Sequence, residues 1–116
     1  MYKVIIAGSR DFADYELLSS FADEVLTGAE DIEIVSGGAR GADALGERYA
    51  REHGHALKVF PADWKKWGRA AGPIRNGQMA DYADALIAFW DGQSAGTRDM
   101  IRKAEDRGLR VQVRMI

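Results

Sequence analysis

The chain lacks cysteine altogether and has only two prolines and two histidines among its 116 residues. Without cysteine, disulfides, thiolate zinc sites and cysteine nucleophiles are excluded. This suits a reducing compartment, and we expect a cytoplasmic protein. The two histidines, His53 and His55, stand near one helix end with no HExxH partner, which favours helix C-terminal cations over metal ligands. We therefore expect neither a metal nor a cofactor.

Long apolar runs and an excess of one charge are missing too. No run approaches the roughly 18 residues that span a membrane, and Met1–Val4 leads into a strand pattern without signal-peptide features. The net charge of -2 argues against a protein that coats nucleic acid, because that function needs a basic face. It leaves room for a local basic pocket. The length fits a single domain over residues 1–116.

Short apolar runs alternate with helical patterns along the whole chain. The predicted strands are 2–7, 32–35, 56–60, 85–90 and 109–113, and the predicted helices begin near 14, 41, 73 and 97. Between the third strand and the third helix, residues 62–71 read as a loop with one helical turn. Such alternation predicts an α/β fold, a Rossmann-like three-layer sandwich around a five-stranded parallel sheet of order 3-2-1-4-5. Ligands of such sheets bind at the carboxyl edge, where the winding reverses.

Three strand-to-helix loops should meet at that edge: Gly8–Arg10, Ser36–Asp43 and Asp91–Thr97. All three are rich in glycine, serine or arginine. For any single loop, tight turns alone explain the glycines. Three such loops on adjacent strands favour a ligand site.

The second loop carries the strongest signal. Gly37 and Gly38 let the backbone approach a ligand, and Gly41 stands where the next helix offers free N–H groups to an anion. Arg40 can add a bidentate contact to phosphate. Asp43 either complements the helix dipole or accepts hydrogen bonds from a ribose or a base. The loop matches neither GxGxxG nor a P-loop with its lysine, so an ordinary ATP-hydrolysing P-loop is disfavoured.

The other two loops add anion-binding candidates. Arg10, directly after the first strand beside Ser9, is either a phosphate ligand or a surface ion-pair partner of Asp11 or Asp14. Gly96 and Thr97 open the last helix, where N–H groups and the Thr97 hydroxyl form a second anion site or a plain N-cap.

A further candidate pair follows Gly72-Pro73, with Pro73 expected at the first helical position. Arg75 and Asn76 then fall in the first turn, where a cation opposes the dipole and benefits from an anionic partner. Trp90 ends the fourth strand and either stacks on a base or caps the core. Trp64 and Trp67 line either the pocket or an interface. The full predicted ligand-binding set is Gly8, Ser9, Arg10, Ser36, Gly37, Gly38, Ala39, Arg40, Gly41, Asp43, Arg75, Asn76, Trp90, Asp91, Gly96 and Thr97.

Four segments together resemble the YspA/YpsA-related branch of the SLOG superfamily. They are Val4–Phe12, Val35–Asp43, Ala71–Asn76 and Ala85–Gly92, in the family's order. The resemblance implies a Rossmann-like fold that senses or processes nucleotide-derived ligands, in bacteria or phages. The superfamily also includes the LOG phosphoribohydrolases and the DNA-processing protein DprA. It implies a homo-oligomer, and exposed Trp64, Trp67 or Met115 would mark an interface.

The chain departs from the LOG enzymes at one position. Their PGGxGTxxE motif ends in a glutamate that assists N-glycosidic cleavage, and its Gly-Thr pair matches Gly96 and Thr97. The glutamate position is Met100, which has no acid or base function, and Asp99 comes one residue early. Asp43 and Asp91 are the remaining catalytic candidates.

Three functions therefore compete. The first is binding or sensing of a nucleoside phosphate, an ADP-ribose-like ligand or a cyclic nucleotide. The second is nucleotide hydrolysis of the LOG type, and the third is DprA-like binding of single-stranded nucleic acid, which the net charge of -2 disfavours.

Overall fold

Five short, largely apolar strands form one parallel sheet in the order β3-β2-β1-β4-β5. The computed structural model describes all residues, 1–116. The strands are β1 (Tyr2–Gly8), β2 (Ile32–Ser36), β3 (Ala56–Val59), β4 (Ala85–Trp90) and β5 (Arg110–Met115). The predicted α/β fold and strand order are confirmed, and β1 and β4 pair in parallel at the point where the winding reverses.

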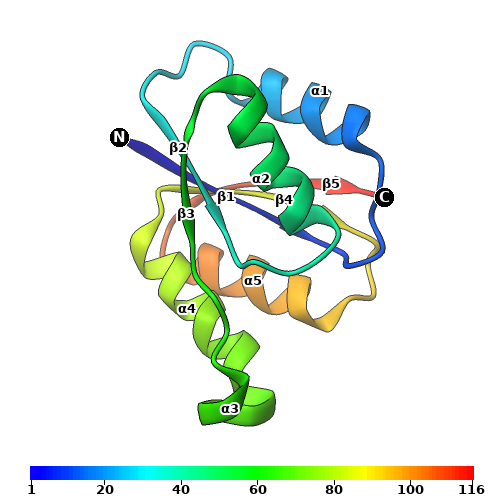
Figure 1. Cartoon of the computed structure of the whole chain (residues 1–116), viewed down its shortest axis with the longest axis vertical. Helices are drawn as coiled ribbons and strands as arrows, with labels where there is room; N and C mark the ends of the chain where they lie inside the picture. Colours follow the sequence, from blue (N-terminus) through cyan, green and yellow to red (C-terminus); the bar gives the residue numbers. More distant parts are fainter.

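The central strand β1 sends alternate side chains to opposite faces of the sheet. Val4 and Ile6 enter one core and Ile5 and Ala7 the other. All four are buried, as expected for a strand that helices cover on both sides. Figure 1 shows α1 (Tyr15–Val25) and α2 (Ala42–His53) on one face, and α4 (Ala71–Tyr82) and α5 (Ala95–Asp106) on the other.

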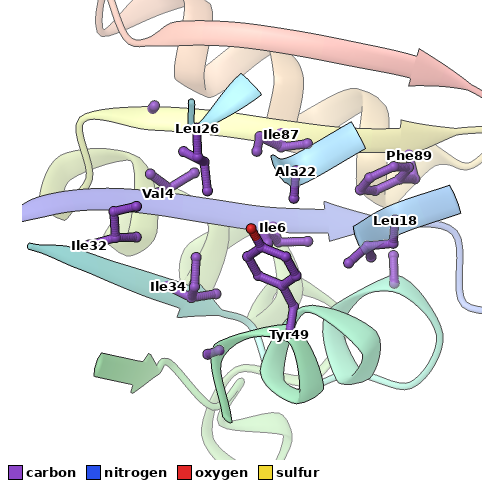
Figure 2. Close-up of a cluster of buried hydrophobic side chains, with 13 residues drawn as sticks. Val4, Ile6, Leu18, Ala22, Leu26, Ile32, Ile34, Tyr49, Ile87 and Phe89 are labelled. Carbon is purple, nitrogen blue, oxygen red and sulfur yellow. The ribbon is translucent and has the colours of Figure 1, made fainter. Parts of the chain in front are cut away.

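The core under α1 and α2 is built from aliphatic strand residues closed by aromatic rings (Figure 2). Phe89 at the end of β4 stacks on Phe12 with ring centroids 5.2 Å apart. Helix α2 lies close to β1, because a Cβ at Gly46 would stand 2.8 Å from the Ile6 side chain. The packing fixes the start of α2 directly beside the carboxyl end of β1.

The predicted starts of α1 and α2 are confirmed, whereas α4 and α5 each begin two residues earlier than predicted. Asp14 caps α1 by accepting a hydrogen bond from Leu17 N at 3.1 Å. Helix α4, however, begins at Ala71, after the short helix α3 (Trp64–Trp67) and the 3-10 turn η1 (Gly68–Ala70). The prediction that Pro73 opens the helix is therefore wrong. Its ring is tolerated in the first turn because N–H groups there have no acceptor within the helix.

The earlier start of α4 also places Arg75 in its second turn. The argument that Arg75 opposes the helix dipole in the first turn is therefore wrong, because the dipole effect fades beyond that turn. Helix α3 lies beyond the N-terminal end of α4, away from the sheet (Figure 1). No helix is long and apolar enough to cross a membrane.

Candidate functional site

A cavity of about 580 Å³ opens at the carboxyl ends of β1 and β4. The loops after β1, β2 and β4 contribute to its wall, and α4 closes it from below. Eleven of the predicted ligand-binding residues line it: Gly8, Ser9, Arg10, Ala39, Arg40, Asp43, Arg75, Asn76, Asp91, Gly96 and Thr97. The structure therefore brings together three loops that lie far apart in the sequence, at the edge where the winding of the sheet reverses.

The loop after β1 is pressed against β4. The Ser9 amide donates to Phe89 O at 3.0 Å, and a Cβ at Gly8 would stand 2.3 Å from that same oxygen. The Ser9 side chain is buried at 6% exposure, and its hydroxyl makes no hydrogen bond of normal geometry within the protein. Because Ser9 borders the cavity, this buried hydroxyl is available to a bound molecule.

The loop after β2 is locked to the loop after β1. Gly41 has φ 76, and a Cβ there would stand 2.4 Å from the carbonyl oxygens of Ser9 and Arg10. The Ala42 amide donates to Ser9 O at 3.2 Å. Glycine at position 41 is thus required by close approach of the two backbones.

This locking engages part of the row of free amides that was predicted for this loop. The Gly38 amide donates to Ser36 Oγ at 3.1 Å and the Ala39 amide to Asp43 Oδ2 at 3.3 Å. The Ala42 amide is also used, as described above. Ser36 is fully buried and donates to Glu47 Oε2 at 2.6 Å, so its hydroxyl organises the loop. The loop is a rigid wall more than an anion cradle.

Asp43 presents a buried carboxyl to the cavity. Its exposure is 6%, and burial raises its pKa to about 6. The hydrogen bond from the Ala39 amide and the nearby Arg75 guanidinium oppose that rise. The Asp43 carboxyl thus holds the loop through the Ala39 amide and borders the cavity, and its predicted hydrogen bonds to a ribose or a base remain a prediction.

Arg75 reaches from α4 to the loop after β2, residues 36–43, which we call the glycine loop. Its guanidinium donates to Gly37 O and, through Nε, to Asn76 Oδ1 at 3.1 Å. A Cβ at Gly37 would stand 2.6 Å from Arg75 Nη1 and 2.8 Å from Asp43 Oδ2, so a larger residue there would displace these side-chain ends. Burial and the neighbouring Arg10 lower the pKa of Arg75, and Asp43 opposes that effect. Asp43 is thus the acidic group that acts on Arg75, although the two form no ion pair.

Asn76 ties α4 to the start of α5. Its side-chain amide donates to Asp99 Oδ2 at 3.0 Å and to Gly96 O at 3.3 Å. Asp99 in turn forms an ion pair with Lys103 at 3.0 Å. The Asp99 carboxylate lines the cavity but is already engaged, which makes it a structural group.

The loop after β4 is organised by its own side chains. Asp91 Oδ1 accepts hydrogen bonds from the Gln93 and Ser94 amides, each at 2.8 Å. These bonds are the main cause that lowers the pKa of Asp91, and the Ser9 hydroxyl contributes least. Asp91 therefore stays ionised and braces the turn.

Helix α5 begins at Ala95, with Ser94 as its N-cap. The Ser94 hydroxyl accepts from the Thr97 amide at 3.4 Å and pairs with the Thr97 hydroxyl at 3.1 Å. The N-cap is therefore Ser94 and not Thr97, whose hydroxyl supports the cap by its bond to Ser94 Oγ. The amides of Ala95 and Gly96 line the cavity and have no acceptor within the protein.

Trp90 lies outside the cavity. Its indole N–H donates to Ser94 O at 3.1 Å, and the Arg98 guanidinium lies 5.6 Å from the ring centroid. The structure gives Trp90 the role of supporting the loop after β4. Stacking on a base, one of its two predicted roles, does not fit this position.

Two of the lining residues outside the predicted set come from the α3–η1 turn. Trp64 of α3 lines the cavity whereas Trp67 does not, and Arg69 of η1 lines it as well. The single helical turn predicted within residues 62–71 is confirmed as α3. The sequence did not show that this turn faces the site, because its only signal is its place just before Gly72-Pro73.

Positive and negative charges balance around the cavity. Its lining includes four arginines (Arg10, Arg40, Arg69 and Arg75) and four aspartates (Asp11, Asp43, Asp91 and Asp99). Asp11 and Arg40 form an exposed pair at 3.7 Å, which is worth little to stability. Such a lining suits a compact ligand that carries both phosphate and hydroxyl groups.

The fold and the cavity together define a small Rossmann-like domain with a cavity at the carboxyl edge of its sheet. The model of the YspA, cpYpsA-related SLOG family matches residues 2–67. The Gene 61 protein of Mycobacterium phage D29 is 37% identical over 118 residues, covering 96% of this chain and 94% of the phage protein. The chain therefore belongs to the YspA, cpYpsA-related SLOG family.

Two solved structures share the fold. The DNA processing protein A (DprA) from Streptococcus pneumoniae matches 97% of this chain with a TM-score of 0.77 and 19% identity. The structural-genomics target TM1055 matches 96% of it with a TM-score of 0.69 and 20% identity. The chain spans 50% of the DprA chain and 72% of TM1055. At these identities the likeness shows the fold alone.

Proposed function

We propose that this protein binds or senses a nucleotide or nucleotide-derived ligand, such as a nucleoside phosphate, an ADP-ribose-like molecule or a cyclic nucleotide. The observation that carries the proposal is the cavity of about 580 Å³, which has arginines and the free amides of Ala95 and Gly96 on its wall. Its volume lies within the roughly 300–1,000 Å³ that is usual for small-molecule sites.

The phosphate would lie between the start of α5 and the loop after β1. Free amides at a helix N-terminus, combined with the positive end of the helix dipole, favour an anion. Arg10 borders this place, is exposed and has no ion-pair partner. It is the arginine available at this place, because Arg75 is held by Gly37 O, Arg40 faces Asp11, and Arg69, although unpaired, lies on η1.

The sugar or base would lie toward Ser9 and Asp43. The Ser9 hydroxyl makes no hydrogen bond of normal geometry within the protein, and the Asp43 carboxyl has acceptor capacity beyond the single bond from Ala39. A ribose hydroxyl can donate to one and accept from the other. Polar groups of this kind give a site its specificity because they are costly to leave unpaired in a buried place.

Isothermal titration calorimetry with AMP, ADP and cyclic AMP tests the proposal. A ligand at 100 times its Kd should also stabilise the protein by about 2.7 kcal/mol. Arg10→Ala should weaken binding at least ten-fold, because a hydrogen bond to a charged group contributes roughly 1.5–3 kcal/mol. Arg102→Ala removes the same charge from an exposed position of α5 outside the cavity and should leave binding unchanged. Absence of binding by every nucleotide contradicts the proposal.

Nucleotide hydrolysis is a second candidate, favoured by one observation. The pKa of about 6 at Asp43 gives a buried carboxyl that exchanges protons near neutral pH, as a general acid or base requires. Asp91 and Asp99 are bound to their neighbours, and Met100 at the LOG glutamate position is a buried apolar wall residue. Chromatography of AMP incubated with the protein should show ribose 5-phosphate release that Asp43→Asn abolishes. Binding without turnover rules this candidate out.

A further inference from the structure

A second cavity, of about 560 Å³, lies beside the first, and residues after β2 and β3 contribute to its lining. We call it the second chamber. The lining residues common to both cavities are Arg10, Ala39, Arg40, Trp64 and Arg75. Three of these five are arginines, which suit an anionic group at the boundary. Each cavity then offers space on its own side of that group.

The two cavities differ in charge. Aspartates line the first cavity, as described above, but no acidic residue lines the second chamber. Apart from the shared residues, its wall consists of small or apolar groups: Gly37, Gly38, Val59, Pro61 and Ala62. This combination of apolar surface and arginines suits a flat apolar group that is attached to an anion.

Trp64 offers an open aromatic face at the boundary. It is 52% exposed, and a Cβ at Gly72 would stand 3.6 Å from its Cη2, so the indole edge lies over α4. Asp63 caps the short helix by accepting from the Lys66 amide at 3.1 Å, which fixes the backbone of Trp64. No ring or cation covers Trp64, whereas Lys66 Nζ lies 4.8 Å from the ring centroid of Trp67.

We propose that the second chamber is a subsite for a second nucleoside-sized group, joined through phosphate to the nucleotide in the first cavity, and that Trp64 stacks on it. The inference rests on the proposed function, because it assumes a nucleotide in the first cavity. The bridging phosphate lies against Arg10 and Arg75, the two boundary arginines without an acidic ion-pair partner. Either a diphosphate-bridged dinucleotide or a two-nucleotide step of a single strand has this chemistry.

Calorimetric titrations with AMP, NAD⁺ and the 5′-phosphorylated dinucleotide pApA test the subsite. NAD⁺ or pApA, the two-part ligands, should bind at least ten-fold more tightly than AMP. The tighter of the two shows whether the subsite takes a diphosphate-bridged dinucleotide or a two-nucleotide step of a single strand. Trp64→Ala should weaken that ligand by about ten-fold or more, as expected for loss of base stacking. Trp64→Phe should keep most of the affinity. Trp67→Ala, on the same helix but outside both cavities, should have no effect.

A variant confined to the second chamber separates its role from that of the first cavity. Ala62→Glu adds a carboxylate to a wall that has none, so it should weaken the two-part ligand and leave AMP unchanged. Equal affinity for AMP and both two-part ligands, or equal effects of Trp64→Ala and Trp67→Ala, overturns the subsite. If AMP still binds in that case, the proposed function is unaffected. Failure of all three probes to bind contradicts both.

Discussion

At the scale of single residues, the Asp43 carboxyl links the site to stability. Burial holds its pKa at about 6 in the folded chain, well above the ordinary value of 3.8. The folded state therefore binds the proton more tightly than the unfolded state. The cost of ionising the buried group is absent well below pH 4 and grows until the pH exceeds the folded pKa.

Asp43→Asn removes this cost, so we expect the variant to gain stability relative to the natural chain as the pH rises. The gain in unfolding free energy should increase by roughly 1 kcal/mol between pH 5 and pH 7.5. One unit of pKa difference corresponds to about 1.4 kcal/mol, and only part of the titration of Asp43 falls in this range. Urea unfolding at both pH values measures it. A difference between the two proteins that is constant with pH contradicts the assignment of a raised pKa to Asp43.

Gly41 is the residue whose replacement should damage the site most directly. Its φ 76 and ψ −129 lie outside the regions open to other residues, and a Cβ would stand 2.4 Å from two carbonyl oxygens. We expect Gly41→Ala to cost about 3 kcal/mol or more, from strain and overpacking together. Gly54→Ala, at φ 71 with open space around it, should cost only about 1 kcal/mol. Equal melting temperatures for the two variants contradict the close approach.

Part of the site could be predicted from the sequence, residue by residue, and part could not. The glycine loop and Arg10 could be predicted because their place after a strand fixes them at the sheet edge. The engagement of the Gly38, Ala39 and Ala42 amides could not, because it depends on how two loops meet in space.

At the scale of elements, the packing of α2 on β1 positions the glycine loop. The sequence predicts both elements from their apolar periodicity, but it does not show that Gly46 is the point of contact. We expect Gly46→Ala to destabilise the fold by about 1–2 kcal/mol. The cost of the contact between its Cβ and Ile6 at 2.8 Å outweighs the gain in helix propensity of about 1 kcal/mol.

Gly77 in the middle of α4 is the matched control. A Cβ there would meet only the end of the flexible Arg107 side chain at 3.7 Å. Gly77→Ala should therefore stabilise the protein by up to about 1 kcal/mol through helix propensity. Thermal unfolding of both variants gives the comparison, and a stabilising Gly46→Ala would show that α2 does not contact β1 this closely.

The elements were predicted more fully than their placement. The strands and four long helices follow from periodicity, and the helical turn predicted within residues 62–71 is α3. It forms between β3 and α4, where Asp63 caps it and Gly68 ends it. The turn brings Trp64 and Arg69 to the cavity, which the sequence did not show because it depends on how the turn packs beside α4.

At the scale of the whole molecule, four arginines line the first cavity of a chain whose net charge is -2. This distribution favours a compact ligand over a long polyanion, despite the shared fold with DprA. We expect a 12-nucleotide strand to bind no more than a few-fold tighter than a dinucleotide, with a shallow salt dependence. Fluorescence anisotropy across a salt series measures this, and affinity that climbs steadily with strand length contradicts it.

Exposed apolar residues lie at two separate places on the surface. Trp64 and Trp67 are 52% and 46% exposed, and Met115 on the edge strand β5 is 50% exposed. The predicted homo-oligomer remains a prediction, which light scattering on a size-exclusion column tests. A change in oligomeric state on Trp67→Ala or on Met115→Lys would tell which of the two places forms the interface.

The central claim is that a nucleotide binds at the carboxyl edge of β1 and β4. The most direct measurement is an NMR titration of the ¹⁵N-labelled 12.8 kDa chain with AMP. The account predicts that the largest amide shifts fall on Ser9, Arg10, Ala95 and Gly96, with Thr27 and Gly54 at the far side unchanged. Shifts centred anywhere else, or none at saturating AMP, would contradict it.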